Sequence, residues 1–189
     1  MAKQGGKIVV ILLLIVAGFF YTQKARAGGN ILINEVLVKP TDSRFIEFYN
    51  SSSSPVDLTG WYLQRKTQGG TSFGSLVSKT NFVGKIISAN GYFLISRLAM
   101  ISADIVLSGL TLSESNIIQL KDSGGEVVDA AEWGAALEDG KSLEREASGG
   151  WRTSQHAGGT PRAANSLVVI PTPTPIEPPS ATPTPTPTP

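Results

Sequence analysis

The sequence contains no cysteine and only one histidine, His156. Without cysteine the chain has no disulfide, no thiolate nucleophile and no Cys-ligated zinc site, so its stability has to come from burial of a core. A Ser-His-Asp triad would have to use His156, which stands in the polar stretch 153–159 near the end of the folded part. We assign it no catalytic role and expect a surface loop there.

Helical periodicity is also missing over any useful length. Short apolar or alternating runs occur instead, and turn-forming Gly, Asn, Asp and Ser residues separate them. They cover residues 31–38, 44–50, 61–66, 82–87, 91–96, 116–121, 126–130 and 141–146. Strands of this length and spacing predict an all-β sandwich or barrel.

Acidic residues are absent from residues 1–27, which carry Lys3, Lys7, Lys24 and Arg26. A basic start, the apolar run 8–20 and the small-residue site Ala25-x-Ala27 predict a secretory signal peptide. The apolar run is shorter than the roughly 20 residues of a membrane helix, although an uncleaved N-terminal anchor stays open as an alternative. Both interpretations predict a secreted or cell-surface domain, with membrane contact only through an uncleaved segment.

The formal charge of +1 depends on that N-terminal segment. Removing its four basic residues from 16 leaves 12 Lys and Arg against 15 Asp and Glu, a net charge of −3. Non-specific nucleic-acid binding needs clustered basic side chains, so the composition argues against it.

The C-terminal residues 167–189 are rich in Pro and Thr and have no pattern that could bury a core. We expect a disordered, polyproline-like linker whose threonines are candidates for O-glycosylation, or a tail without a specific role. Residues 28–166 remain as the single folded domain.

Three motifs in order carry a family resemblance: Ile33-Asn-Glu-Val36, Phe45-Ile-Glu-Phe-Tyr-Asn50 and Val56-Asp-Leu-Thr-Gly-Trp61. Further pieces follow at residues 91–96, 117–129, 140–145, 151 and 160–165. Together they resemble the lamin tail domain in its bacterial exported form, over nearly all of residues 30–166. The resemblance implies an immunoglobulin-like β-sandwich, an interaction module and no shared catalytic centre. One departure is Arg162, where the family often has glycine after Thr-Pro.

Four polar residues of the first motifs are weak calcium candidates, because calcium takes carboxylate and amide oxygens: Glu35, Glu47, Asn50 and Asp57. The structural alternative places Glu35 and Glu47 on solvent faces of strands, and has Asn50 and Asp57 bond the backbone of their own loops. No Asp-x-Asp-x-Asp-Gly spacing is present, so we expect no metal and no cofactor.

Three tryptophans could form a sugar-binding platform. The glycine neighbours of Trp61 and Trp151 favour close packing, which leaves Trp133 as the candidate ligand contact. The predicted core consists of Ile33, Ile46, Phe48, Leu58, Trp61, Phe93, Ile95, Ile118 and Leu120.

These observations predict a non-catalytic exported interaction or adhesion module at the bacterial cell surface or envelope, whose partner is an envelope protein or glycan. Two alternatives stay open. One is a carbohydrate-binding module, and the other is an accessory domain of a secreted hydrolase or nuclease system.

Overall fold

The computed structural model describes residues 30–99, 103–134 and 137–166. The predicted signal peptide and the Pro/Thr-rich linker lie outside the described residues. Within those residues no helix is long and apolar enough to cross a membrane.

The described chain consists of strands with two short 3-10 turns. In chain order these are β1 (Ile31–Leu37), η1 (Thr41–Ser43), β2 (Phe45–Asn50), β3 (Val56–Asp57), β4 (Tyr62–Thr67), β5 (Gly74–Val77), η2 (Lys79–Phe82), β6 (Ile86–Ile87), β7 (Tyr92–Ser96), β8 (Ile105–Val106), β9 (Asn116–Lys121), β10 (Val127–Trp133), β11 (Lys141–Arg145) and β12 (Trp151–Ala157).

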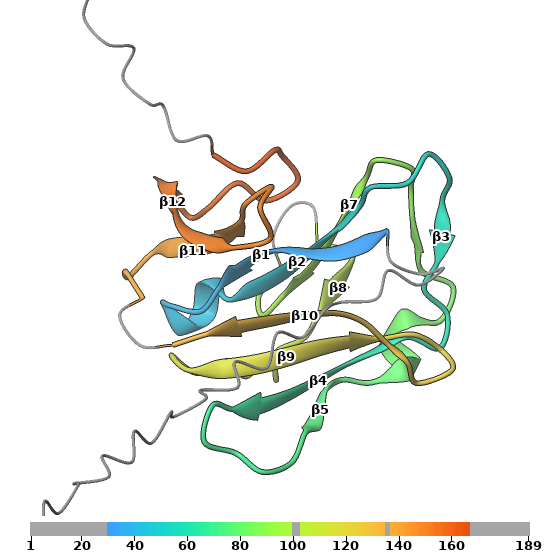
Figure 1. Ribbon diagram of the computed structural model, residues 1–189, viewed down its shortest axis with the longest axis horizontal. Helices are drawn as coiled ribbons and strands as arrows, with labels where there is room; N and C mark the ends of the chain where they lie inside the picture. Colours follow the sequence, from blue (N-terminus) through green and yellow to red (C-terminus); the bar gives the residue numbers. More distant parts are fainter. Residues whose placement is uncertain (1–29, 100–102, 135–136, 167–189) are drawn as a thin grey trace, which may run out of the picture.

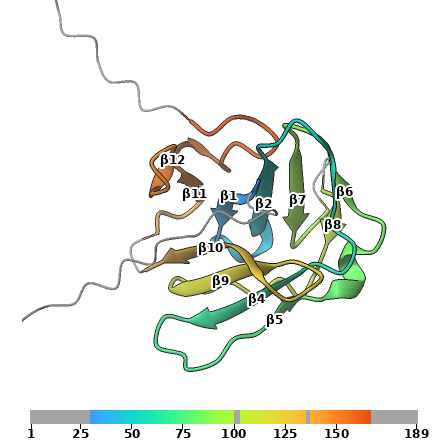
Figure 2. The same cartoon turned by 45° about the vertical axis from the view of Figure 1, so that its right-hand side comes forward.

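Two sheets form the layers of a sandwich. One has six strands in the order β12-β11-β1-β2-β7-β8, and the other has four in the order β10-β9-β4-β5. In Figure 1 the six-stranded sheet is the upper layer and the four-stranded sheet the lower one, and Figure 2 shows the same layers after a 45° turn. The short pair β3–β6 forms a separate two-stranded sheet. The expected all-β, immunoglobulin-like sandwich is confirmed.

Alternation along the strands builds the core between the layers. Ile46 and Phe48 face inward from β2, while Phe45 and Glu47 face the other side of the sheet. The Phe48 ring stacks on Phe82 and on Phe93, with centroid distances of 6.3 and 6.1 Å. Every residue of the predicted core is buried, with Trp61 the most exposed of them at 7%.

The corner before β4 depends on one glycine. Gly60 has φ +83°, and a Cβ there would lie 3.0 Å from the Ser123 side chain. The Trp61 N–H donates to the Leu58 carbonyl at 2.9 Å, which closes the turn and directs the indole into the core. Glycine is needed here because other L-residues rarely adopt this backbone conformation.

Three local predictions are wrong. The run 82–87 is not one strand: η2 ends at Phe82, Gly84 has φ +68°, and only Ile86–Ile87 pairs with β3. The stretch 67–78, which is not among the predicted strands because its Gly, Ser and Thr residues favour an irregular connection, contains β5, which pairs with β4. Residues 153–157 belong to β12, because pairing with β11 supplies the order that their polar composition does not predict.

Candidate functional site

Three glutamates from neighbouring strands lie side by side on the outer face of the six-stranded sheet. Glu35 on β1 is directly opposite Glu144 on β11 and Glu47 on β2. All three are fully buried. We call them the carboxylate row. The expectation that Glu35 and Glu47 face solvent is therefore wrong.

A β-bulge in β1 creates this alignment. The register with β2 shifts between Ile33 and Glu35, which leaves Asn34 as the extra residue. Before the bulge Ile33 faces the core, and after it Val36 does. A bulge reverses the alternation of a strand, so Glu35 points to the same side as Glu47.

The carboxylate row is covered by residues 158–166, which we call the closing loop. Thr160 of this loop contacts both Glu35 oxygens: its N–H donates to Oε1 at 2.8 Å, and its hydroxyl oxygen lies 3.3 Å from Oε2. Ser142 on β11 donates a further bond to Oε1 at 2.5 Å. Gly159 passes so close that a Cβ there would overlap Glu35 and Ser142.

Glu47 is held in the same way. The Arg162 N–H donates to Oε2 at 2.5 Å, and the Asn34 amide donates to Oε1 at 3.0 Å. Asn34 and Asn165 exchange side-chain bonds of 2.9 and 3.2 Å. The bulged residue of β1 thus joins Glu47 to the far end of the closing loop.

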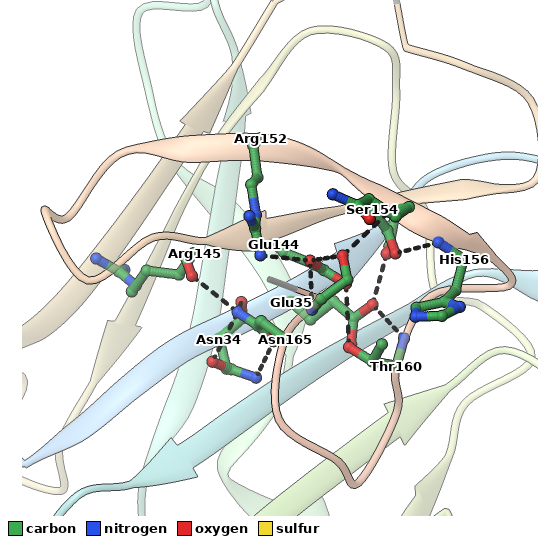
Figure 3. A network of polar contacts seen from close by, with 12 residues as sticks. Asn34, Glu35, Glu144, Arg145, Arg152, Ser154, His156, Thr160 and Asn165 are labelled. Carbon is green, nitrogen blue, oxygen red and sulfur yellow. Dashed lines mark hydrogen bonds and ion pairs between the residues drawn. The ribbon is translucent and has the colours of Figure 1, made fainter. Parts of the chain in front are cut away.

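Glu144 receives the largest number of donors (Figure 3). Its Oε2 accepts bonds from the Ser166 N–H at 2.9 Å and the Ser166 hydroxyl at 2.6 Å, and its Oε1 from the Thr160 hydroxyl at 3.1 Å. Arg152 forms an ion pair with Oε2 at 3.4 Å. The closing loop is therefore tied to all three members of the carboxylate row.

Burial and hydrogen bonding give the three carboxylates of the row different pKa values. Burial raises the pKa of Glu47 to about 7, against the bonds from Arg162 and Asn34 that lower it. Burial also raises the pKa of Glu35, with a further contribution from the Glu144 charge. Burial acts on Glu144 in the same direction, but the bonds from Ser166, Ser154 and Thr160 outweigh it and hold its pKa below the ordinary value. The row thus combines an ionised carboxylate with two that favour protonation.

A fourth buried carboxylate, outside the row, joins the two sheets. Asp129 on β10 accepts a bond from the Ile33 N–H of β1 at 2.7 Å and pairs with Arg145 of β11 at 2.5 Å. Burial raises the pKa of Asp129, while the Arg145 charge lowers it. Arg145 also donates to the Ile33 carbonyl at 2.7 Å. This pair links the four-stranded layer to the six-stranded one.

The other two calcium candidates lie elsewhere. Asn50 accepts a bond from the Ser52 N–H at 3.0 Å, and Asp57 accepts one from the Thr59 N–H at 2.8 Å. Both bond the backbone of their own loops, as the structural alternative predicts. Within residues 30–99, 103–134 and 137–166, no group of three His, Cys, Asp or Glu side chains could hold a metal ion. The oxygens of the carboxylate row are already occupied by protein donors.

Trp133, the candidate ligand contact, is buried and not available to a sugar. It is only 5% exposed, and its indole N–H donates to the Ser113 carbonyl at 2.9 Å. Asp129, Ala131 and Trp133 alternate along β10, which places all three on the buried face of that strand. Trp151 is half-buried, with the Arg145 guanidinium 4.9 Å from its ring centroid.

One G-x-S-x-G segment, Gly70-Thr-Ser-Phe-Gly74, is present in the sequence. A nucleophile elbow with this spacing requires a strand, a sharp turn and a helix. The structure places Ser72 in the connection between β4 and β5, and the chain continues as a strand. His156 is exposed on β12, the outermost strand of the other sheet. The fold does not supply the geometry of an elbow at Ser72.

Comparison with known families gives one match. The model of the Lamin Tail Domain family matches residues 24–135. No curated protein matches the chain. The matched range holds Glu35, Glu47 and Asp129, while Glu144 and the closing loop follow it.

Proposed function

The chain belongs to the lamin tail domain family, and we propose that it acts as a non-catalytic interaction module exported to the bacterial cell surface or envelope. The family consists of immunoglobulin-like domains without a catalytic centre, which generally serve protein interactions. Export and the envelope location rest on the predicted signal peptide of residues 1–27.

The observation that carries this proposal is the use of the buried acidic side chains. Glu35, Glu47 and Glu144 accept their bonds from the closing loop and from neighbouring strands of the same chain. A general acid or base has to reach a substrate proton. Carboxylates enclosed by their own chain hold the closing loop on the sheet instead, so the proposed function lies at the surface.

An apolar surface supports a protein partner. Val83, Ile86 and Val106 are 65%, 61% and 53% exposed. Lys85 donates to the Asp104 carbonyl at 2.9 Å, which holds the β6 segment against the chain entering β8 (Figure 2). Contiguous exposed aliphatic surface is typical of protein contact sites, and we propose that these three side chains belong to one such site. β8 is also the free edge of its sheet, where a partner backbone could pair.

The buried tryptophans argue against the carbohydrate-binding alternative. A sugar platform needs exposed aromatic faces, but Trp61 and Trp133 are buried and Trp151 is half-buried beneath Arg145. The accessory-domain alternative is compatible with the same surface, since it also requires a protein partner.

Capture of a partner from an envelope extract tests the proposal. The full chain is compared with Ile86→Glu/Val106→Glu, which places two charges on the apolar surface. Val127→Glu is the matched comparison, because Val127 is 42% exposed at the start of β10. We expect one protein that binds the wild type and Val127→Glu but not the double variant.

Equal capture by all three chains, or by none, would overturn the proposed surface. A captured hydrolase or nuclease would select the accessory-domain alternative. Export is tested separately by mass spectrometry of the native N-terminus, which we expect to begin at Gly28. A full-length N-terminus in the cytoplasmic fraction would contradict it.

A further inference from the structure

Three arginines meet at one end of the sandwich, away from the carboxylate row. Arg44 precedes β2 and continues the inward alternation of Ile46 and Phe48. Arg97 follows β7 on the neighbouring strand, and its N–H donates to the Arg44 carbonyl at 2.9 Å. The two side chains therefore leave adjacent strands of the six-stranded sheet on its inner side.

The third arginine comes from the opposite layer. Arg65 on β4 is directly opposite Ile118 on β9 and shares the inward face with Leu63. Leu63 and Ile118 are fully buried. The start of β2 and the end of β4 both lie at the left-hand end of the sandwich in Figure 1. Both layers thus direct cationic side chains toward the opening between the sheets.

Part of this cluster is already positioned by the backbone. The Arg44 Nε donates to the Val38 carbonyl at 2.8 Å, which leaves its terminal nitrogens for other partners. The Arg97 Nη1 lies 3.5 Å from the Leu110 carbonyl oxygen. The Arg65 side chain has no hydrogen-bond or ion-pair partner within the part of the chain that the structure describes. A guanidinium has five N–H donors, so most of the donor capacity of the three is unused.

The charges of the cluster are poorly balanced. Burial lowers the pKa of Arg44, and the positive charges of Arg97 and Arg65 lower it further. Asp42 is the one carboxylate among the groups that shift the pKa of Arg44. It lies 3.5 Å from the Arg97 Nε, and its side chain is 75% exposed. Three positive charges therefore face one negative charge that is mostly in solvent.

We propose that Arg44, Arg65 and Arg97 form a binding site for a tetrahedral dianion, specifically a phosphate group. With Asp42 the site has a net charge of +2, which a phosphate dianion balances. Guanidinium forks also match the geometry of phosphate oxygens. Nucleic acid would need an extended basic track rather than one convergent cluster. The inference is independent of the proposed interaction role, since the site requires no partner protein.

Titration calorimetry with inorganic phosphate on the full chain, at low ionic strength, tests the site. Arg65→Gln is the central variant, because Arg65 makes no bond that folding would lose. We expect its affinity for phosphate to fall about 10-fold, the value of one charge-assisted contact. Asp42→Asn removes the competing carboxylate and should bind phosphate more tightly than the wild type. Arg65→Lys keeps the charge but not the fork and should lie in between.

Lys121→Gln serves as the charge-matched comparison. Lys121 is the last residue of β9. The end of β4 that carries Arg65 is paired with residues near the start of β9, so Lys121 lies away from Arg65. Its loss should leave phosphate affinity unchanged. Equal weakening in Lys121→Gln and Arg65→Gln would overturn the site, because only overall charge would then matter. Absence of phosphate binding by the wild type would also overturn it.

Two further titrations distinguish the sources of the anion. Sulfate binding as tight as phosphate would overturn the specificity for phosphate. Glycerol phosphate binding more tightly than inorganic phosphate would support a phosphorylated ligand, and equal binding of the two would support free phosphate.

Discussion

Glu35 and Glu47 lie directly opposite each other on β1 and β2, and both are fully buried. Like charges in this arrangement repel, and burial of either charge is unfavourable. The closing loop offsets the cost: the Thr160 N–H bonds Glu35 and the Arg162 N–H bonds Glu47. A raised pKa then allows protonation to relieve the remaining repulsion.

We expect the free energy of unfolding to fall as pH rises from about 4.5 to about 7. The pKa of Glu47 is about 7 in the folded chain, against an ordinary value of 4.5. The folded state therefore binds more protons in this range, and its advantage is lost as pH rises through the folded pKa. For Glu47 the loss is on the order of 3 kcal/mol. Glu35 and Asp129 act in the same direction.

Urea denaturation at pH 5 and pH 8 measures this effect. Glu47→Gln should flatten the dependence, since its side chain does not titrate. The pKa of Glu144 lies below its ordinary value of 4.5. Its contribution to the free energy of unfolding is therefore lost only as pH falls below about 4.5, and it does not oppose the trend between pH 5 and pH 8. A wild-type stability that rises between pH 5 and pH 8 would contradict the prediction.

Gly159→Ala should destabilise the chain more than Gly158→Ala. Both glycines have positive φ, +76° and +79°, so either alanine costs about 1–2 kcal/mol in backbone strain. Only at residue 159 would the new Cβ meet Glu35 and Ser142, which adds about 1–3 kcal/mol. Denaturant titration of the two variants gives the difference. Equal losses would show that the closing loop can move away from the carboxylate row.

Trp61→Ala should cost about 3–5 kcal/mol, the usual loss for a large core side chain. Trp151→Ala is the comparison: Trp151 is half-buried and stacks on Arg145, so we expect a loss of about 1–2 kcal/mol. Thermal unfolding followed by near-UV circular dichroism measures both. A reversible melting temperature near that of the wild type for Trp61→Ala would remove Trp61 from the core.

Removal of either partner of the Asp129–Arg145 pair should cost about 3–5 kcal/mol, because the other charge stays buried without its counterion. The side chains are 5% and 15% exposed. Asp129→Asn and Arg145→Gln together should cost less than the sum of the two single changes, with a coupling of about 0.5–3 kcal/mol. Additive losses in this double-mutant cycle would show that the pair does not act as a unit.

Local patterns in the sequence were enough to predict much of the sandwich. The alternation of Ile46 and Phe48 assigned the inward face of β2, and the polar turn at residues 122–125 predicted the β9–β10 hairpin. The bonds that Asn50 and Asp57, the last residues of β2 and β3, accept from N–H groups two residues on agree with the structural alternative, because Asx side chains commonly bond nearby backbone groups. Each of these features depends on neighbours in the chain.

The same patterns failed for β12 and for Trp133. Residues 153–157 have the composition of a loop, and only pairing with β11 makes them a strand. Trp133 was the candidate ligand contact, but it is buried because β10 turns its alternate residues toward the other sheet. Strand pairing and sheet packing involve partners that the local sequence does not identify.

The sequence therefore established the all-β class and the inward faces of the main strands, since these follow from period-two alternation and turn chemistry, while the family followed from the resemblance of its ordered motifs. It could not reveal what covers the outer face of β1 and β2. Glu35 and Thr160 are 125 residues apart, and a bulge at Asn34 brings Glu35 under the closing loop. Contact over such a separation depends on strand order and register, which exist only once the sheets have assembled.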